Sequence, residues 1–405
     1  MTKKIFKGIF ILAFFVIVFL IGIYLRMRYP TTSPFTTVRY YYDQLLHPRV
    51  EIKKQVIGFL PYWLIDNAQY IRPNLVSQLI YFSLTAEGDG HLLRVKDGET
   101  DPGWRIWNSQ RANDLIARAQ ISGGKFLVTI AIQNTDNIES ILNSDEYQQN
   151  LIRDVIEQVK QKNLDGVNLD VEYVGIPDDI YRQKFVKFVQ IFTKQLRQEK
   201  PEIITSIDVF PRSVRKPRLF DIHTIVSFFN YVIVMSYDYY TPTAKSAGPT
   251  APIKGYVEKN YFFDYVTTYD DYKKAVPSEK IIMGVPYYGY DWPVVNGDEP
   301  LSPQIEPQNP NDVAILSYAR AKEDPLYSDK EKCKFDELAQ QPWCWYHDEK
   351  ERVDRQAWFE DERSIEAKFE FANKNNLQGI AIWALGYDKN YPELWDAIEK
   401  KFTTP

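Results

Sequence analysis

The chain has 405 residues, of which 44% are hydrophobic and 25% are charged, a composition typical of a globular protein with enough apolar material for one large domain. Its formal net charge is −5 and its basic residues are scattered among acidic ones, which excludes the basic surface expected of a nucleic-acid-binding protein. Aromatic residues make up 15% of the chain, and such rings suit both a packed core and a surface that stacks against sugars.

The first predicted element is an apolar helix near the N-terminus. Residues 9–25, "IFILAFFVIVFLIGIYL", carry no charge and are just long enough to span a bilayer. Three lysines precede this segment, and no small-residue cleavage site follows it. We therefore expect a signal anchor over 9–25, with residues 1–8 cytoplasmic, a stalk over 26–54 and the remaining chain outside the membrane. A cleaved signal peptide is the alternative.

From Val56 onward, short apolar runs alternate with longer amphipathic stretches such as 147–163 and 180–198, whose apolar residues recur every three or four positions. This alternation predicts a parallel sheet built from β/α units. Eight such units indicate a (β/α)8 TIM barrel over residues 55–402. The eight predicted strands are "VIGFLPYW" from 56, "LVSQLIYFSL" from 75, "KFLVTIAI" from 125, "LDGVNLDVEY" from 164, "IITSIDVF" from 203, "YVIVMSYD" from 231, "KIIMGVPYYGY" from 280 and "GIAIWALGYD" from 379.

An insertion is expected between the seventh and eighth strands. Residues 293–362 are rich in Pro, Asn, Asp and Glu and fit no β/α unit. They contain the only two cysteines, Cys333 and Cys344, which could form one local disulfide in an oxidising compartment or remain two unpaired thiols.

The fourth strand carries acids where a core strand should be apolar. Because side chains alternate along a strand, Asn168, Asp170 and Glu172 share one face, and the intervening apolar residues share the other. The polar face then points into the barrel mouth. Asp170 and Glu172 would lie about 6 to 7 Å apart along the strand. One of two carboxyls this close in a partly desolvated site should have a raised pKa and act as an acid.

Other polar or aromatic residues lie at the C-terminal ends of the predicted strands, where barrel active sites are found. The four histidines show no metal-ligand spacing, so we expect neither a metal nor another cofactor. The further candidates for the site are Tyr62, Trp63, Met235, Tyr237, Asp238, Tyr288 and Trp383.

Four motifs in the expected order resemble glycoside hydrolase family 18, the chitinase-like (β/α)8 enzymes. "DGVNLDVE" is similar to the strand-four signature DGxDxDxE, "MSYD" to the strand-six motif, "GVPYYGY" to the strand-seven motif and "IAIWALGYD" to the strand-eight tryptophan motif. The branch of chitobiase-like and spore-cortex-lytic N-acetylglucosaminidases is the most similar. Strand three departs from the family, because "TIAIQN" stands where Ser-x-Gly-Gly is common.

The resemblance implies substrate-assisted hydrolysis of glycans that contain N-acetylglucosamine, without a nucleophile from the enzyme. Glu172 would be the general acid and then the base for water. Asp170 would orient the 2-acetamido group of the sugar, whose oxygen attacks the anomeric carbon, and Tyr237 would hydrogen-bond that oxygen. Trp383 would form the floor of the subsite. Tyr62, Met235 and Asp238 would line the same subsite, and Asn168 and Tyr288 are also expected to take part in substrate binding.

Asn168 is a departure, because much of the family has Asp here, which is thought to share a proton with the residue that matches Asp170. An amide cannot take up that charge, so Asp170 should lose one like-charged neighbour and have a less elevated pKa. The chitobiase-like branch also carries Asn at this position. The substitution therefore favours that branch.

Two functional classes remain open at this stage. The first is a membrane-anchored glycosidase that acts on peptidoglycan or a chitin-like glycan outside the cell. The second is a catalytically silent glycan-binding protein on the same fold. The presence of Glu172, Asp170 and Tyr237 together favours the enzyme, because a binding protein has no need of a general acid.

Overall fold

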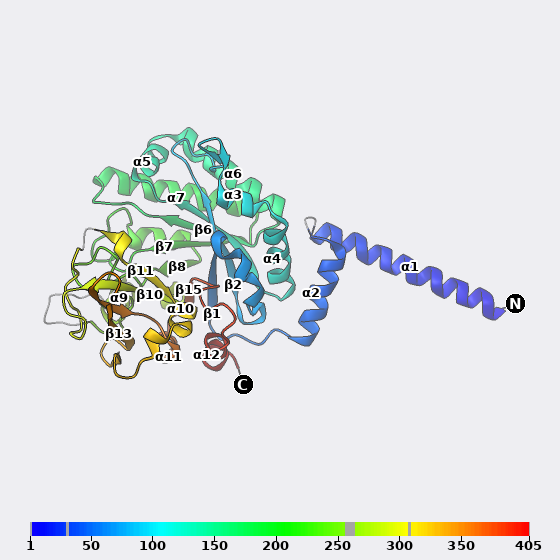
Figure 1. The fold of residues 1–405 in the computed structure, drawn as a ribbon. Helices are drawn as coiled ribbons and strands as arrows, with labels where there is room; N and C mark the ends of the chain where they lie inside the picture. Colours follow the sequence, from blue (N-terminus) through cyan, green and yellow to red (C-terminus); the bar gives the residue numbers. More distant parts are fainter. Residues whose placement is uncertain (1, 30–31, 256–263, 307–308, 405) are drawn as a thin grey trace.

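A closed barrel of eight parallel strands forms the centre of the protein, as predicted (Figure 1). The computed structural model describes residues 2–29, 32–255, 264–306 and 309–404, with side chains from residue 13 onward. The strands follow one another around the barrel in the order β1-β15-β9-β8-β7-β6-β5-β2. Their bounds are β1 Gln55–Pro61, β2 Gln78–Thr85, β5 Lys125–Ile132, β6 Gly166–Val171, β7 Ile204–Val209, β8 Tyr231–Val234, β9 Ile281–Pro286 and β15 Gly379–Trp383.

Helices surround the barrel in the positions that the amphipathic stretches predict (Figure 1). Local sequence fixes their ends. For example, the Ser144 hydroxyl accepts a hydrogen bond from the Tyr147 amide at the start of α6, and Asn163 adopts a left-handed conformation at its end. The main helices are α3 Pro102–Trp107, α4 Gln110–Ile121, α5 Thr135–Asn143, α6 Asp145–Lys162, α7 Asp179–Glu199, α8 Ile222–Ile225, α9 Tyr265–Ala275, α11 Glu362–Lys374 and α12 Glu393–Phe402.

The two faces of β6 contact different parts of the protein. Val167, Leu169 and Val171 are buried in the main apolar cluster, which also contains residues of the surrounding helices such as Phe185 and Phe188. The apolar side chains of the fourth predicted strand therefore pack against the surrounding helices. The polar side chains that alternate with them face the interior of the barrel.

The interior of the barrel contains both apolar and polar side chains. Side chains of β1, β2, β5, β8, β9 and β15 form a small apolar cluster with members such as Phe59 and Phe82. Fully or almost fully buried polar side chains come from β5, β6 and β7 in matched register. These polar residues are Thr129, Asn168, Asp170, Ser206 and Asp208.

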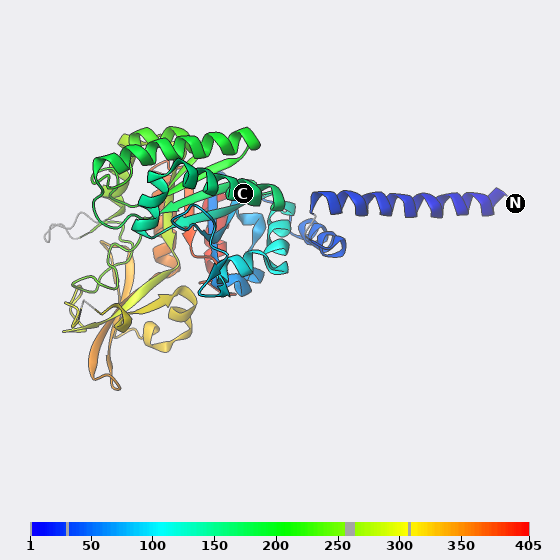
Figure 2. The same ribbon diagram turned by 90° about the horizontal axis from the view of Figure 1, so that it is seen from above.

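The insertion between the seventh and eighth barrel strands is an antiparallel sheet of five strands, seen at the lower side of the molecule in Figure 2. It begins earlier than predicted. The seventh predicted strand, 280–290, is two strands, because β9 ends at Pro286 and β10 starts at Tyr288. The sheet consists of β10 Tyr288–Val294, β11 Ala314–Ser317, β12 Cys333–Asp336, β13 Gln341–Asp348 and β14 Val353–Trp358.

Buried pairs hold this inserted sheet together. The indole rings of Trp343 and Trp358 stack with centroids 5.6 Å apart. The buried guanidinium of Arg355 lies 3.0 Å from a carboxylate oxygen of Asp291. A buried charge of this kind is stable only when it is paired, so the ion pair fixes β14 against β10.

Cys333 and Cys344 form a disulfide, which settles the question that the spacing left open. They stand opposite each other on β12 and β13. We expect Cys333→Ala/Cys344→Ala to lower the free energy of unfolding by about 2 to 3 kcal/mol, because the bond constrains a short loop in the unfolded chain. Urea unfolding with and without reductant measures the effect. Two thiols that react in the denatured but unreduced protein would contradict the bond.

The N-terminal region contains two helices, α1 Thr2–Arg28 and α2 Pro34–Leu46. Both views show α1 projecting away from the barrel (Figures 1 and 2). The residues predicted as a stalk include α2, which lies beside α4. Just before α2, the Thr32 hydroxyl donates a hydrogen bond to the Asn113 carbonyl of α4 (3.2 Å). The predicted membrane span over 9–25 is not supported: within the described part of the chain, no helix is long and apolar enough to cross a membrane. The side chains of residues 9–12 lie outside that part.

Candidate active site

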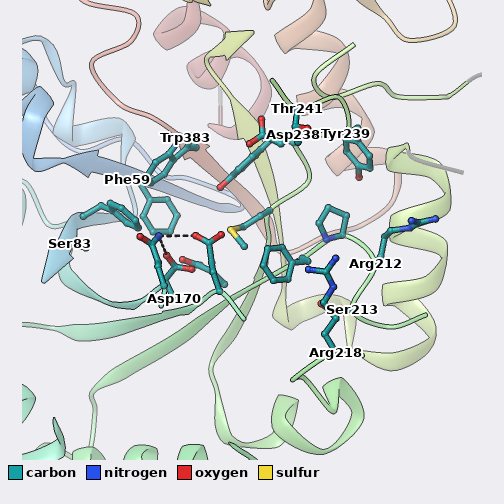
Figure 3. A pocket seen from close by; sticks show the side chains of 18 of the residues that line it. Phe59, Ser83, Asp170, Arg212, Ser213, Arg218, Asp238, Tyr239, Thr241 and Trp383 are labelled. Atoms are coloured by element: carbon teal, nitrogen blue, oxygen red, sulfur yellow. Dashed lines mark hydrogen bonds between the residues drawn. The ribbon is translucent and has the colours of Figure 1, made fainter. Parts of the chain in front are cut away.

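A cleft of about 750 Å³ opens at the C-terminal ends of the barrel strands (Figure 3). This volume lies within the range of about 300 to 1,000 Å³ typical of small-molecule sites. Most of the predicted residues come together here. The predicted residues that line the cleft are Tyr62, Trp63, Asp170, Glu172, Met235, Tyr237, Asp238 and Trp383.

Two predicted residues lie behind the cleft wall. Asn168 is fully buried, and its side chain contacts other polar residues of the barrel interior. Tyr288 is only 4% exposed and donates a hydrogen bond to Asp238 (2.6 Å). Neither of them lines the cleft. Both hold other site residues in place from behind the cleft, and their part in substrate binding stays a prediction.

The Gln133 amide joins the two candidate catalytic carboxyls. Gln133 follows β5, and its Nε2 donates to Glu172 Oε1 (2.8 Å) and to Asp170 Oδ2 (3.2 Å). One amide group therefore holds both acids at the same point of the cleft (Figure 3). Asp170 Oδ1 is buried and has no hydrogen-bond partner among the described residues.

Glu172 has the properties of a general acid. It follows the last residue of β6 and is half-buried. Burial raises the pKa of Glu172, the hydrogen bond from Gln133 opposes this shift, and the charge of Asp238 adds to it. A carboxyl whose pKa is raised toward neutrality can hold a proton and release it to a leaving group.

Asp208 is a buried acid that the sequence analysis did not single out. It lies on β7 directly beside Asp170 of β6 in the strand register, and it is only 3% exposed. Asn168 Nδ2 donates to Asp208 Oδ2 (2.7 Å), while the Ser206 hydroxyl donates to Asn168 Oδ1 (2.8 Å). Asn168 of β6 therefore binds both Ser206 and Asp208 of β7.

Asp208 and Asp170 are neighbouring buried acids. Burial raises the pKa of Asp208 to about 8. Burial also raises the pKa of Asp170 well above its ordinary value, and the charges of Asp208 and Glu172 add to the shift. The expectation that Asp170 would lose a like-charged neighbour was therefore incomplete. Asn168 removes one carboxylate from β6, but β7 supplies another.

The signal for Asp208 was present in the sequence. In "ITSIDV", Ser206 and Asp208 alternate with apolar residues as Asn168 and Asp170 do in "GVNLDV". Applying the same alternation to the fifth predicted strand would have placed both residues inside the barrel. The same alternation in "TIAIQ" puts Gln133 on the face of Thr129, so this residue also had a signal in the sequence.

Tyr237 and Asp238 follow β8 and form another side of the cleft. Burial, together with the surrounding carboxyls, raises the pKa of Tyr237 well above its ordinary value, so the hydroxyl stays protonated and can donate. Asp238 accepts hydrogen bonds from Tyr288 (2.6 Å) and Tyr290 (2.9 Å). Added to Gly284, a Cβ atom would come within 3.0 Å of the Tyr237 ring and 2.4 Å of the Val234 carbonyl, so only glycine fits there.

Trp383 ends β15 and provides an aromatic wall. Its ring contacts Phe82, with centroids 4.6 Å apart, and lies 5.9 Å from Phe59 and 6.5 Å from Trp63. Figure 3 shows Trp383 and Phe59 beside each other at the cleft. A fixed aromatic face of this kind suits the apolar face of a sugar ring.

The described residues contain no group of three or more His, Cys, Asp or Glu side chains arranged to hold a metal ion. The cleft contains carboxyls, tyrosines and an aromatic wall. The fold and the site together define a (β/α)8 barrel with paired acids at the C-terminal ends of its strands, the arrangement of a glycosidase.

The comparison with known families agrees with this class. The sequence model for the glycosyl hydrolases family 18 matches residues 55–388, and the chain belongs to this family. Two relatives are named cortical fragment-lytic enzyme. The protein of Bacillus subtilis (strain 168) is 26% identical over 269 residues, 65% of this chain and 55% of that protein. The protein of Bacillus anthracis is 25% identical over 348 residues, 84% of this chain and 71% of that protein.

Solved structures share the fold. The spore cortex-lytic enzyme SleL of Bacillus megaterium QM B1551 has a TM-score of 0.66 at 23% identity, covering 87% of this chain and 75% of that chain. The Group IV chitinase of Ostrinia furnacalis, in complex with allosamidin, has a TM-score of 0.72 at 18% identity, covering 86% of this chain and 98% of that chain. The chain spans just over half of the Bacillus subtilis relative, so its own activity is inferred from its site.

Proposed function

We propose that this protein hydrolyses β-1,4 linkages of glycans that contain N-acetylglucosamine, with retention of configuration and with the substrate's own acetamido group as the nucleophile. The observation that carries this proposal is the single amide of Gln133 that holds Glu172 and Asp170 together at the cleft. An acid with a raised pKa and a second acid beside it are what substrate-assisted cleavage requires.

The reaction proceeds in two steps. In the first, Glu172 donates its proton to the glycosidic oxygen as the bond from that oxygen to the anomeric carbon breaks, and the acetamido oxygen forms a new bond to the same carbon. Asp170, which lines the cleft, is the acceptor for the acetamido N–H. In the second step Glu172 takes a proton from water, and the water oxygen replaces the acetamido oxygen at the anomeric carbon.

Tyr237 would donate a hydrogen bond to the acetamido oxygen. We expect Tyr237→Phe to lower kcat by about 10²-fold, the effect of removing one donor from a site where charge develops. KM should change less, because the hydrogen bond strengthens as the reaction proceeds. Steady-state kinetics on chito-oligosaccharides measure both constants. The exposed Tyr70, changed to Phe, is the matched control, and an equal loss in the two variants would contradict the role.

The direct test is turnover by the full-length protein. Aryl N-acetylglucosaminides, chito-oligosaccharides and muramidase-digested peptidoglycan are incubated with it, and the released chromophore or reducing ends are measured. Hydrolysis of at least one substrate is expected. Binding without turnover on all three would instead favour the glycan-binding protein, the second class considered from the sequence.

We also infer that the barrel acts outside the cytoplasm. The disulfide between Cys333 and Cys344 supports this, because such bonds form and persist in oxidising compartments. Protease added to intact cells should degrade the barrel if it is extracytoplasmic. Full protection in intact cells, with degradation after lysis, would contradict this location.

A further inference from the structure

The segment 210–221, which follows β7, forms a basic side of the cleft. Its sequence, "FPRSVRKPRLFD", contains four basic residues. Arg212, Lys216 and Arg218 line the same cleft as Glu172 and Asp170. Figure 3 shows Arg212 and Arg218 across the cleft from Phe59 and Ser83. The cleft therefore has acids in its floor and cations on one wall.

The fourth basic residue of the segment, Arg215, has a structural ion pair instead of a place in the cleft. Arg215 does not line the cleft. It pairs with Asp271 of α9, with its Nη2 3.1 Å from Asp271 Oδ1. Among the described residues, Lys216 and Arg218 form no ion pair. The guanidinium of Arg218 instead lies over the Phe210 ring, 5.4 Å from its centroid, and both Lys216 and Arg218 are exposed.

The acids of the cleft do not cancel this positive charge at neutral pH. Burial is the largest cause that raises the pKa values of Asp170, Asp208 and Glu172. Raised pKa values favour the protonated form of these three carboxyls, so their total negative charge is smaller. Lys216 and Arg218 lie exposed on the opposite wall. A ligand entering the cleft therefore meets a positive wall.

We propose that Lys216 and Arg218 form a subsite for a carboxylate carried by the glycan, so that the cleft prefers an anionic glycan containing N-acetylglucosamine to a neutral one. A guanidinium binds a carboxylate through paired hydrogen bonds, and an ammonium adds a point charge. Peptidoglycan provides such carboxylates on the peptides of its alternate sugars, or on the lactyl groups of those sugars that carry no peptide, whereas chitin provides none. This inference rests on the proposed function, since it names the substrate class of the same cleft.

The test is a binding measurement that needs no turnover. Full-length Glu172→Gln protein is titrated calorimetrically with two probes: an N-acetylglucosaminyl-N-acetylmuramyl peptide, and the same compound with its carboxylates amidated. We expect the amidated probe to bind about 10-fold more weakly, a loss typical of charge-assisted hydrogen bonds. Lys216→Gln/Arg218→Gln in this background should weaken binding of the anionic probe by the same factor and leave the neutral probe unchanged.

A matched control removes two positive charges far from the cleft. Arg39 of α2 and Lys194 of α7 are exposed, and neither lines the cleft. Arg39→Gln/Lys194→Gln should bind both probes as the parent protein does. Rising salt should weaken binding of the anionic probe to the parent protein more than to the Lys216/Arg218 variant, because the exposed pair is screened.

Three results would overturn the subsite: equal affinity of the parent for both probes, equal losses for both probes in the Lys216/Arg218 variant, or no binding of either probe. Failure of the proposed function looks different. In that case the wild-type protein hydrolyses no glycan, whatever its preference in binding. The carboxylate subsite and the proposed hydrolytic function can therefore be refuted independently.

Discussion

Glu172→Gln is expected to lower kcat by about 10³-fold, within the range found when a general acid is removed. Glutamine keeps the size of the side chain and can still accept the hydrogen bond from Gln133, so the fold and the position of Asp170 should be retained. It has no proton to give to the leaving oxygen. Steady-state kinetics on a chito-oligosaccharide, together with thermal unfolding, separate lost chemistry from lost structure.

The matched control is Glu202→Gln, since Glu202 is exposed and does not line the cleft. Its kcat should equal that of the wild type. Aryl glycosides with acidic leaving groups should recover part of the activity of Glu172→Gln, because they need less protonation. Turnover that survives Glu172→Gln unchanged on ordinary glycans would remove the proposed mechanism.

Asp208→Asn is expected to change the pH dependence of stability. The pKa of Asp208 is about 8 in the folded protein and 3.8 in its unperturbed state. Between these values the folded state binds the proton more tightly than the unfolded state does. The contribution of Asp208 to stability is thus fully present below the lower pKa and is lost as the pH rises through the higher one.

The variant should therefore gain stability relative to the wild type as the pH rises from about 5 to about 8, by up to about 1.4 kcal/mol per pH unit. Asparagine can still accept the hydrogen bond from Asn168, which preserves the local structure. Urea unfolding at several pH values gives the curve. Asp298→Asn, at an exposed position, is the control and should follow the wild type. Parallel curves for Asp208→Asn and the wild type would show that Asp208 is ionised across this range.

The barrel and its acids were predictable because they depend on local periodicity. Alternation of side chains along β6 placed Asp170 and Glu172 at the barrel mouth, and the spacing of apolar runs gave the eight strands. The resemblance of the motifs to the family then indicated the catalytic roles expected of these residues. These features follow from residues close together in the sequence.

The remaining features depend on contacts between distant segments. The pair of Asp170 and Asp208 exists because β6 and β7 are aligned in one register. Tyr288 begins a new strand and donates to Asp238 from behind the cleft. The basic wall arises from a loop whose charges look ordinary in the sequence. Register and loop direction decide these contacts, and no single stretch of the chain encodes them.

The hydrogen bonds of Asn168 also have a consequence for how this chain can diverge. Its oxygen accepts from Ser206 and its nitrogen donates to Asp208, so the amide has one permitted orientation. An acid at position 168 would add a further carboxyl beside Asp208 and replace the amide that now donates to it. The two positions are therefore expected to covary among relatives, with an acid at position 168 or at position 208 but rarely at both.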